Sequence, residues 1–261
     1  MKPFFFGPSA SQLYGVYHPA IGSHLKTEGF VLCYPFGQEY MRAHRAFRQI
    51  AVQLSKNGFH TLRFDYRGTG DSAENLEDMS ASDWLGDIGT AVEELKSMTG
   101  LKKISLIGLR MGALLANTIS NQRDDIERLV VWDPIISGSA YEEELYSELN
   151  KENVEAWNFI DEEKMLHFNG FALTPTLRES LKKLDMLDVK TKVDSVLQVV
   201  STENVYFSRL RQCFQKEISK YQYSYSESPS DWNYVDDFGG ILLPQPVIKT
   251  IVEWVTEKTA L

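Results

Sequence analysis

The sequence predicts an α/β protein with a mostly parallel central sheet, helices on both faces and a helical cap inserted late in the chain. Short apolar runs alternate with helical stretches from residue 30 to residue 133. This alternation is typical of parallel strands joined by helices that cover the sheet. Residues 137–190 are then polar and hold no convincing strand, before the alternation resumes at 195. We therefore assign 1–136 and 191–261 to the core and 137–190 to a cap or lid.

The elements follow in order along the chain. Two short strands are expected first, and the later strands are apolar or Tyr-rich runs bounded by turn residues. Helices are expected where apolar residues share a face, with Ser82 and Asp83 as a cap and Gly100 as a stop. The expected strands are 4–6, 12–18, 30–34, 59–65, 103–108, 128–133, 195–201 and 218–225. The expected helices are 40–56, 83–98, 110–121, 140–149, 176–187, 205–216 and one that starts after Pro244 and runs through Trp254.

The composition limits the classes of function. A formal net charge of −9 over 261 residues argues against a nucleic-acid partner, which needs a basic face. The two cysteines, Cys33 and Cys213, form no disulfide or metal pattern, and no cofactor motif is found. The apolar run at the N-terminus is too short for a signal peptide, and no run approaches a membrane span. A cytoplasmic protein with no membrane partner is expected.

Residues 104–112, Ile-Ser-Leu-Ile-Gly-Leu-Arg-Met-Gly, carry the most informative motif. An apolar strand runs into Gly-x-x-x-Gly and then into a helix of small residues. This is the layout of a nucleophile elbow, Gly-x-Ser-x-Gly, which presents its central side chain on a sharp turn. The central residue here is Arg110, and a guanidinium keeps its proton and cannot attack a carbonyl.

Two further motifs accompany it. Tyr34-Pro35-Phe36-Gly37 follows a buried strand, and residues 65–72 read Asp-Tyr-Arg-Gly-Thr-Gly-Asp-Ser. With the motif at 108–112, these segments resemble the α/β-hydrolase superfamily over nearly the whole chain, and its serine aminopeptidase-like branch in particular. Residues 35–39, 108–112 and Trp-Asp-Pro at 132–134 are similar to those of exosortase-system-associated hydrolases. The resemblance implies an oxyanion loop at Phe36 and Gly37.

The resemblance also implies a Ser-His-Asp triad, which the sequence does not complete. Glu203 stands at the expected position of the acid, after the strand that ends at 201. The loop at 226–243, where the histidine is expected, holds Trp232 and no histidine. Because the nucleophile and the base are both missing, we reject an ordinary serine-hydrolase mechanism. No catalytic residue is assigned by triad chemistry.

Arg110 should face an anion, because a cation at a helix N-terminus is unfavourable and an unpaired buried guanidinium is costlier still. The anion could be internal, with Glu203 or Asp133 as the partner. It could instead be a ligand, for which Arg110 would act as a bidentate clamp for carboxylate or phosphate. Both hold if a ligand competes with the internal carboxylate. The residues expected to line this ligand site are Phe36, Gly37, Glu39, Arg110, Met111, Asp133, Glu203 and Trp232.

Three functions remain open. The favoured one is a degenerate hydrolase-fold protein that binds a small anionic or acyl ligand, or a partner protein, without turnover. The alternative is a hydrolase or acyltransferase that acts on esters or thioesters by a non-triad mechanism, using Arg110 and the oxyanion loop. The third is a module that docks a biosynthetic enzyme or a carrier protein through residues 137–190.

Overall fold

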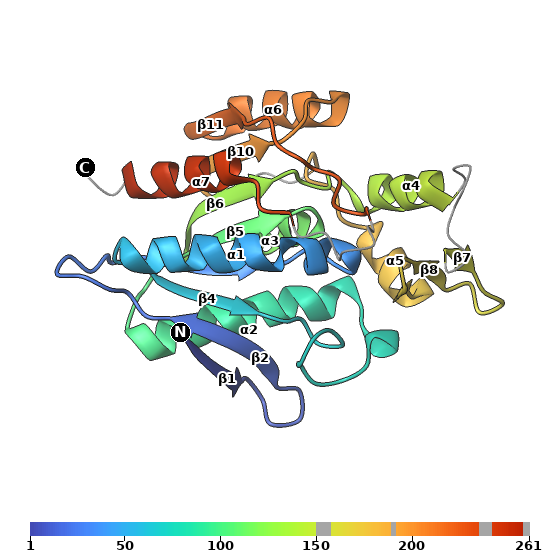
Figure 1. The fold of residues 1–261 in the computed structure, drawn as a ribbon, viewed down its shortest axis with the longest axis horizontal. Helices are drawn as coiled ribbons and strands as arrows, with labels where there is room; N and C mark the ends of the chain where they lie inside the picture. The colour runs from blue at the N-terminus through green and yellow to red at the C-terminus, as the bar shows by residue number, and fades with distance from the viewer. Residues whose placement is uncertain (150–157, 189–191, 235–241, 258–261) are drawn as a thin grey trace.

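One eight-stranded sheet forms the centre of the protein. The structure is a computed structural model that describes residues 1–149, 158–188, 192–234 and 242–257. The sheet has the spatial order β1-β2-β4-β3-β5-β6-β10-β11, and only the pairs β1–β2 and β2–β4 are antiparallel (Figure 1). The predicted mostly parallel sheet is therefore confirmed. Its strands are β1 (Lys2–Phe6), β2 (Leu13–His18), β3 (Gly29–Cys33), β4 (His60–Phe64), β5 (Ile104–Leu109), β6 (Ile126–Trp132), β10 (Ser195–Val200) and β11 (Lys220–Tyr225).

Helices cover both faces of this sheet. Every residue of β3 and of β5 is buried, as is typical of central parallel strands with helices on either side. The first helix packs on β4 and against the last helix, whereas the second packs on β3 and β4 and against the third. These helices are α1 (Gln38–Lys56), α2 (Ala81–Thr99), α3 (Met111–Gln122), α6 (Val205–Glu217) and α7 (Gln245–Glu257).

Helix α2 begins two residues earlier than predicted. Its cap is Ser80, not Ser82, because Asp83 is the third residue of a capping box. The Ser80 hydroxyl accepts the Asp83 backbone N–H, and the Asp83 carboxylate accepts the Ser80 backbone N–H at 3.0 Å. The predicted stop is confirmed, since Gly100 ends the helix in the left-handed conformation with φ 73°.

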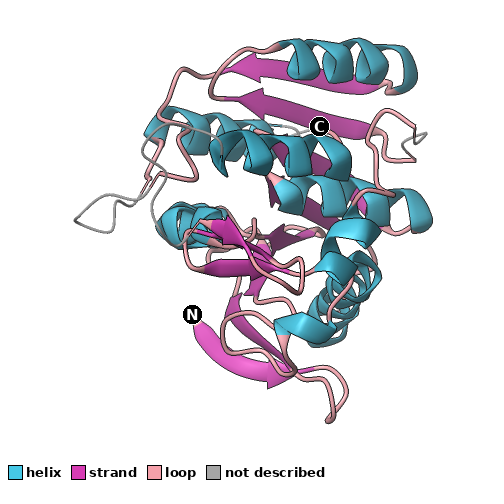
Figure 2. Ribbon diagram, turned by 90° about the vertical axis from the view of Figure 1, so that its right-hand side faces the viewer, coloured by secondary structure: helices cyan, strands magenta, loops and turns pink. Residues whose placement is uncertain are grey.

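The segment between β6 and β10 lies outside the central sheet, and Figure 2 views the molecule from the side on which it lies. It contains helix α4 (Gly138–Leu149), helix α5 (Pro175–Leu181) and a small antiparallel sheet. The expectation that this segment holds no strand is therefore wrong. Its strands are β7 (Phe159–Ile160), β8 (Leu166–Phe168) and β9 (Phe171–Leu173).

Two other expectations for this segment need comment. The predicted helix over 176–187 ends at Leu181, and the backbone then passes through a turn that brings Met186 N to Ile136 O at 2.8 Å. The assignment of residues 137–190 to a separate cap stays a prediction, and part of that range (150–157, 189–190) lies outside the described residues.

Candidate functional site

The turn between β5 and α3 has a strained backbone. Arg110 connects the strand to the helix with φ 54° and ψ −121°, a conformation that residues with a Cβ rarely adopt. Close approach of the chain explains the two flanking glycines. A Cβ on Gly112 would lie 2.2 Å from the Cys33 carbonyl oxygen, and one on Gly108 would lie 2.4 Å from the Gly112 carbonyl oxygen. The sequence pattern at 108–112 thus folds into a sharp strand-to-helix turn that points Arg110 out of the sheet.

Arg110 pairs with two carboxylates, but not with the two that were predicted. Its Nε donates to Glu39 Oε1 at 3.0 Å, and its Nη2 donates to Glu144 Oε1. Among the described residues, neither Glu203 nor Asp133 lies within ion-pair distance of it. The physical reason is position. Glu39 in the first turn of α1 and Glu144 on α4 both lie next to the turn that carries Arg110. The guanidinium therefore pairs with them and not with Asp133 after β6 or Glu203 after β10.

Burial controls the charge of this cluster. The Glu39 side chain is completely buried, and burial raises its pKa to about 7 although Arg110 acts in the opposite direction. Burial alone would lower the pKa of Arg110, but Glu39 and Glu144 reverse this and raise it. The arginine is therefore always charged, while Glu39 exchanges its proton close to neutral pH.

Asp133 and Trp232 form a second buried contact. Asp133 follows β6, and its Oδ1 accepts the Ser201 backbone N–H at 2.7 Å. Its Oδ2 accepts the Trp232 indole N–H at 3.1 Å. Burial raises the pKa of Asp133. Trp232, in the loop after β11, therefore contacts the carboxylate of Asp133 and not that of Glu203.

The other predicted residues are distributed around these contacts. Glu203 is exposed and accepts the Tyr223 hydroxyl at 3.2 Å, away from Arg110. Met111 is fully buried in the core and lines neither the cavity at Arg110 nor the one beside Phe171. Phe36 and Gly37 line a cavity of about 290 Å³ beside Phe171.

Arg110 lines a different cavity, of about 390 Å³. Its walls come from the loop after β6, from α4 and from the start of α6. Arg110 and the predicted oxyanion loop therefore line two different cavities. The lining residues are Arg110, Pro134, Ile135, Ile136, Ala140, Glu143, Glu144, Asn204, Tyr206 and Phe207.

Sequence reasoning missed Glu144 and the wall that α6 contributes. Glu144 belongs to the acidic stretch at 141–163, which gives no sign by itself of which carboxylate points inward. The helical spacing from the buried Tyr141 and Leu145 places Glu144 at the border of the buried face, and this is the signal that could have found it.

The described residues offer no metal site and no membrane helix. No group of three or more histidine, cysteine or acidic side chains is arranged to hold a metal ion in the described ranges. Within the same ranges, no helix is both long enough and apolar enough to span a bilayer.

Comparison with known proteins identifies the family of this chain. Residues 40–196, more than half of the chain, match the family model described as serine aminopeptidase, S33. The chain belongs to the serine aminopeptidase S33 family. In this S33 member, the matched region begins one residue after Glu39. It includes the turn at Arg110, Asp133 and the whole segment between β6 and β10. No curated protein sequence matches the chain.

Solved structures agree on the fold. The esterase Est1E of Butyrivibrio proteoclasticus, in a structure with ferulic acid bound, is 18% identical to this chain with a TM-score of 0.70. The match covers 98% of both chains. An esterase of Pyrococcus furiosus is 15% identical with a TM-score of 0.67, over 98% of this chain and 90% of that one. The proline iminopeptidase of Mycobacterium smegmatis is 11% identical with a TM-score of 0.66, over 98% of both chains. The α/β-hydrolase fold is thereby confirmed.

Proposed function

We propose that this S33 family member binds a small ligand through a carboxylate or acyl group at Arg110 and does not hydrolyse it. In this proposal Arg110 stands where a hydrolase carries its nucleophile, and Trp232 stands where it carries its histidine. An arginine has no nucleophilic lone pair at working pH, and an indole N–H is a donor that takes up no proton. Neither residue can perform the first step of acyl transfer.

The different partners of Nε and Nη2 of the Arg110 guanidinium support ligand binding. Its Nε is held by the fully buried Glu39, whereas its Nη2 is held by Glu144, whose side chain is 39% exposed at the wall of the 390 Å³ cavity. A carboxylate entering the cavity would take the place of Glu144 and pair with a guanidinium that is already positioned. This asymmetry of a fixed inner partner and an exchangeable outer partner is the observation that carries the proposal.

A ligand series and two variants test it. Carboxylic acids of increasing chain length and their neutral amides are titrated into the purified protein, with binding followed by calorimetry and by the thermal midpoint. We expect the acids to bind and the amides not to bind. Glu144→Gln should tighten binding several-fold because it removes the competitor, and Arg110→Met should abolish it. Equal affinity of acids and amides, or an unchanged affinity in Glu144→Gln, would contradict the proposal.

The alternative function, a hydrolase or acyltransferase without a triad, is favoured by one observation. Glu39 has a pKa raised to about 7 beside a permanent cation, and a carboxyl group with such a pKa is suited to general acid–base catalysis. Assays with p-nitrophenyl esters and an acyl thioester separate the two functions. Steady turnover that both Arg110→Met and Glu39→Gln abolish would establish the enzyme. We expect no turnover, and none in Arg110→Ser either.

Two finer assignments remain proposals on the sequence alone. One is the similarity to exosortase-system-associated hydrolases. The other is docking of a carrier protein or biosynthetic enzyme on the segment between β6 and β10. A pull-down that succeeds equally with wild type and Arg110→Met would support docking independently of the arginine.

A further inference from the structure

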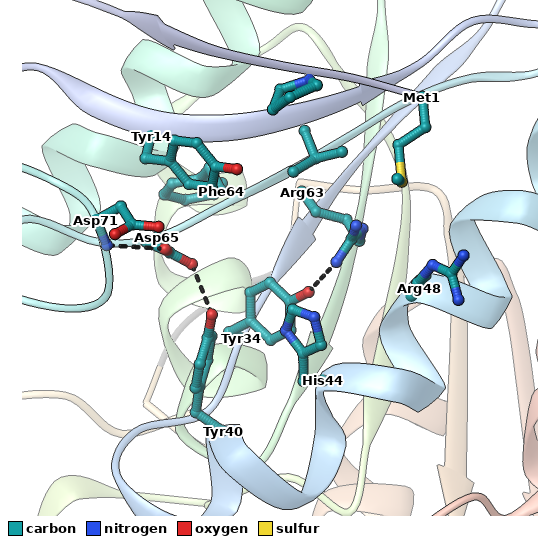
Figure 3. A pocket seen from close by; sticks show the side chains of 12 residues that line it. Met1, Tyr14, Tyr34, Tyr40, His44, Arg48, Arg63, Phe64, Asp65 and Asp71 are labelled. Carbon is teal, nitrogen blue, oxygen red and sulfur yellow. Dashed lines mark hydrogen bonds between the residues drawn. The ribbon is translucent and has the colours of Figure 1, made fainter.

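A third cavity, of about 340 Å³, lies between α1 and the outer strands β1, β2 and β4 (Figure 3). It shares no lining residue with the cavity at Arg110. Tyrosine and phenylalanine side chains form much of its wall, and charged side chains stand at its two ends. The proposed function of the protein does not use this cavity.

A buried arginine without a carboxylate partner stands at one end. Arg63 is only 4% exposed, and the acceptors of its hydrogen bonds are neutral. Its Nε donates to His18 Nε2 at 3.1 Å, and its Nη1 donates to the Tyr34 hydroxyl at 2.7 Å. Among the described residues, no carboxylate lies within 4.0 Å of its guanidinium nitrogens. A buried guanidinium that contacts only neutral acceptors lacks the counter-charge that normally offsets its desolvation.

Neighbouring groups make this end more positive. Arg48 extends from α1 toward the same end of the cavity as Arg63 (Figure 3). It too forms no ion pair within the part of the chain that the structure describes. Burial, followed by Arg63, lowers the pKa of His18 to about 4, and His44 shows the same direction. Burial is the main cause for both histidines, and the nearby Arg63 and Arg48 act in the same direction.

The opposite end carries two acidic residues. Asp65 accepts the Tyr40 hydroxyl at 3.0 Å and the Asp71 backbone N–H at 3.2 Å, and Asp71 also lines the cavity. Figure 3 shows this pair on the far side of Tyr34 and Tyr40 from Arg48. Asp65 is thus hydrogen-bonded locally, and within the described residues neither acidic side chain forms an ion pair with Arg63, although Arg63 acts on the pKa of Asp65. The cavity has one cationic end, one acidic end and an aromatic wall between them.

We propose that this cavity is a binding site for an aromatic oxyanion, with the anionic group between Arg63 and Arg48 and the ring against Tyr14, Tyr40 and Phe64. An arginine pair offers paired N–H donors that match carboxylate or phosphate oxygens. Aromatic side chains pack well against a planar ring. Carboxylate and phosphate share this chemistry, and the probes below distinguish them.

The test uses four probes on the whole protein: 3-phenylpropanoate, its amide, phenyl phosphate and inorganic phosphate. We expect calorimetry to detect one or both aryl oxyanions, inorganic phosphate at least tenfold more weakly, and no binding of the amide. The stronger of the two aryl oxyanions identifies the natural anionic group. Binding of the amide with the same affinity as 3-phenylpropanoate, or of neither aryl oxyanion, overturns the proposal.

Matched variants place the site. Arg48→Gln should raise the Kd at least tenfold. Arg45→Gln, an exposed arginine of the same helix that does not line the cavity, should change it less than twofold. Because Arg48 is exposed, its variant should fold normally, whereas Arg63→Gln could unfold the protein. Arg110→Met should leave this binding unchanged, which separates it from the proposed function. Equal loss in Arg45→Gln and Arg48→Gln would show non-specific attraction and reject the site.

Discussion

Trp232 donates its indole N–H to Asp133 across 3.1 Å, and both side chains are almost completely buried. The contact joins the loop after β11 to the end of β6, two segments 99 residues apart. It holds that loop over α1, where the Asn233 amide donates to Glu39 Oε1 at 3.3 Å. One hydrogen bond between a tryptophan and an aspartate thus helps to enclose the Arg110–Glu39 pair.

Trp232→Phe removes part of the ring and also the hydrogen-bond donor of Asp133 Oδ2, which remains buried. The loss of the donor should destabilise the protein by about 1–3 kcal/mol in addition to the effect of the smaller ring. Trp132→Phe is the matched control. Its indole N–H is buried and has no hydrogen-bond partner among the described residues, so its removal breaks no hydrogen bond. Urea unfolding of both variants measures the difference. Equal destabilisation would mean that the contact with Asp133 contributes nothing.

Glu39 should make stability fall as the pH rises. Its pKa is raised from 4.5 to about 7 in the folded protein, so the folded state binds more protons than the unfolded state between these two values. Stability from this group is complete below about pH 4.5, declines by up to roughly 1.4 kcal/mol per pH unit and is lost above about pH 7.

Glu39→Gln isolates this effect, since glutamine does not titrate. The difference in unfolding free energy between variant and wild type, measured from pH 4.5 to 8, should therefore shift in favour of the variant as the pH rises. A difference that stays constant over this range would refute the raised pKa.

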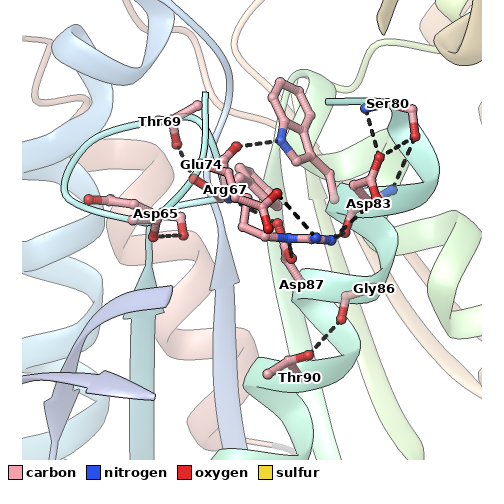
Figure 4. Close-up of polar contacts among 12 residues, drawn as sticks. Asp65, Arg67, Thr69, Glu74, Ser80, Asp83, Gly86, Asp87 and Thr90 are labelled. Atoms are coloured by element: carbon pink, nitrogen blue, oxygen red, sulfur yellow. Dashed lines mark hydrogen bonds and ion pairs between the residues drawn. The ribbon is translucent and has the colours of Figure 1, made fainter. Parts of the chain in front are cut away.

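Arg67 binds the start of α2 to the loop after β4 (Figure 4). Its Nε donates to Asp87 at 2.6 Å, and the Asp87 side chain is only 5% exposed. Arg67→Met should cost about 3 kcal/mol, because Asp87 is left buried and unpaired. Adding Asp87→Asn should recover part of this loss. Lys103→Met breaks an exposed ion pair with Glu127 and should cost less than about 1 kcal/mol. Denaturant unfolding of the four proteins checks this order.

Gly112→Ala should prevent folding or destabilise the protein by well over about 3 kcal/mol, because the new methyl group would overlap the backbone carbonyls of Cys33 and Tyr34. Gly86→Ala is the control within a helix. A Cβ there meets nothing closer than an Arg67 nitrogen at 4.0 Å, and alanine should stabilise the helix by up to about 1 kcal/mol. Soluble yield and thermal midpoint distinguish the two, and a Gly112→Ala protein as stable as wild type would contradict the close approach.

The sequence predicts the central sheet well because most of its strands are apolar runs of five to seven residues with clear turns between them. It fails at β8 and β9, which are three residues long and too short to show alternation. A local signal was nevertheless present. Asn169 and Gly170 both have positive φ, 49° and 82°, as expected for an Asn-Gly hairpin turn.

The site was predicted only in part, because contacts between elements depend on packing rather than on spacing. Glu39 was expected near the pocket from its place after the oxyanion loop. The position of Glu144 depends on how α4 docks, and Gly138 allows its start to press against the Leu181 carbonyl, where a Cβ would lie 2.0 Å away. No periodicity in the sequence encodes that distance between two helices.

The first turn of α1 has a role in two cavities at once. Glu39 holds Arg110, while the next residue, Tyr40, holds Asp65 and lines both the cavity beside Phe36 and the one at Arg63. A rotation or shift of this single turn would therefore change the geometry around both arginines together. The two sites thus share one structural support, whereas removal of the Arg110 side chain alone leaves every residue that lines the cavity at Arg63 in place.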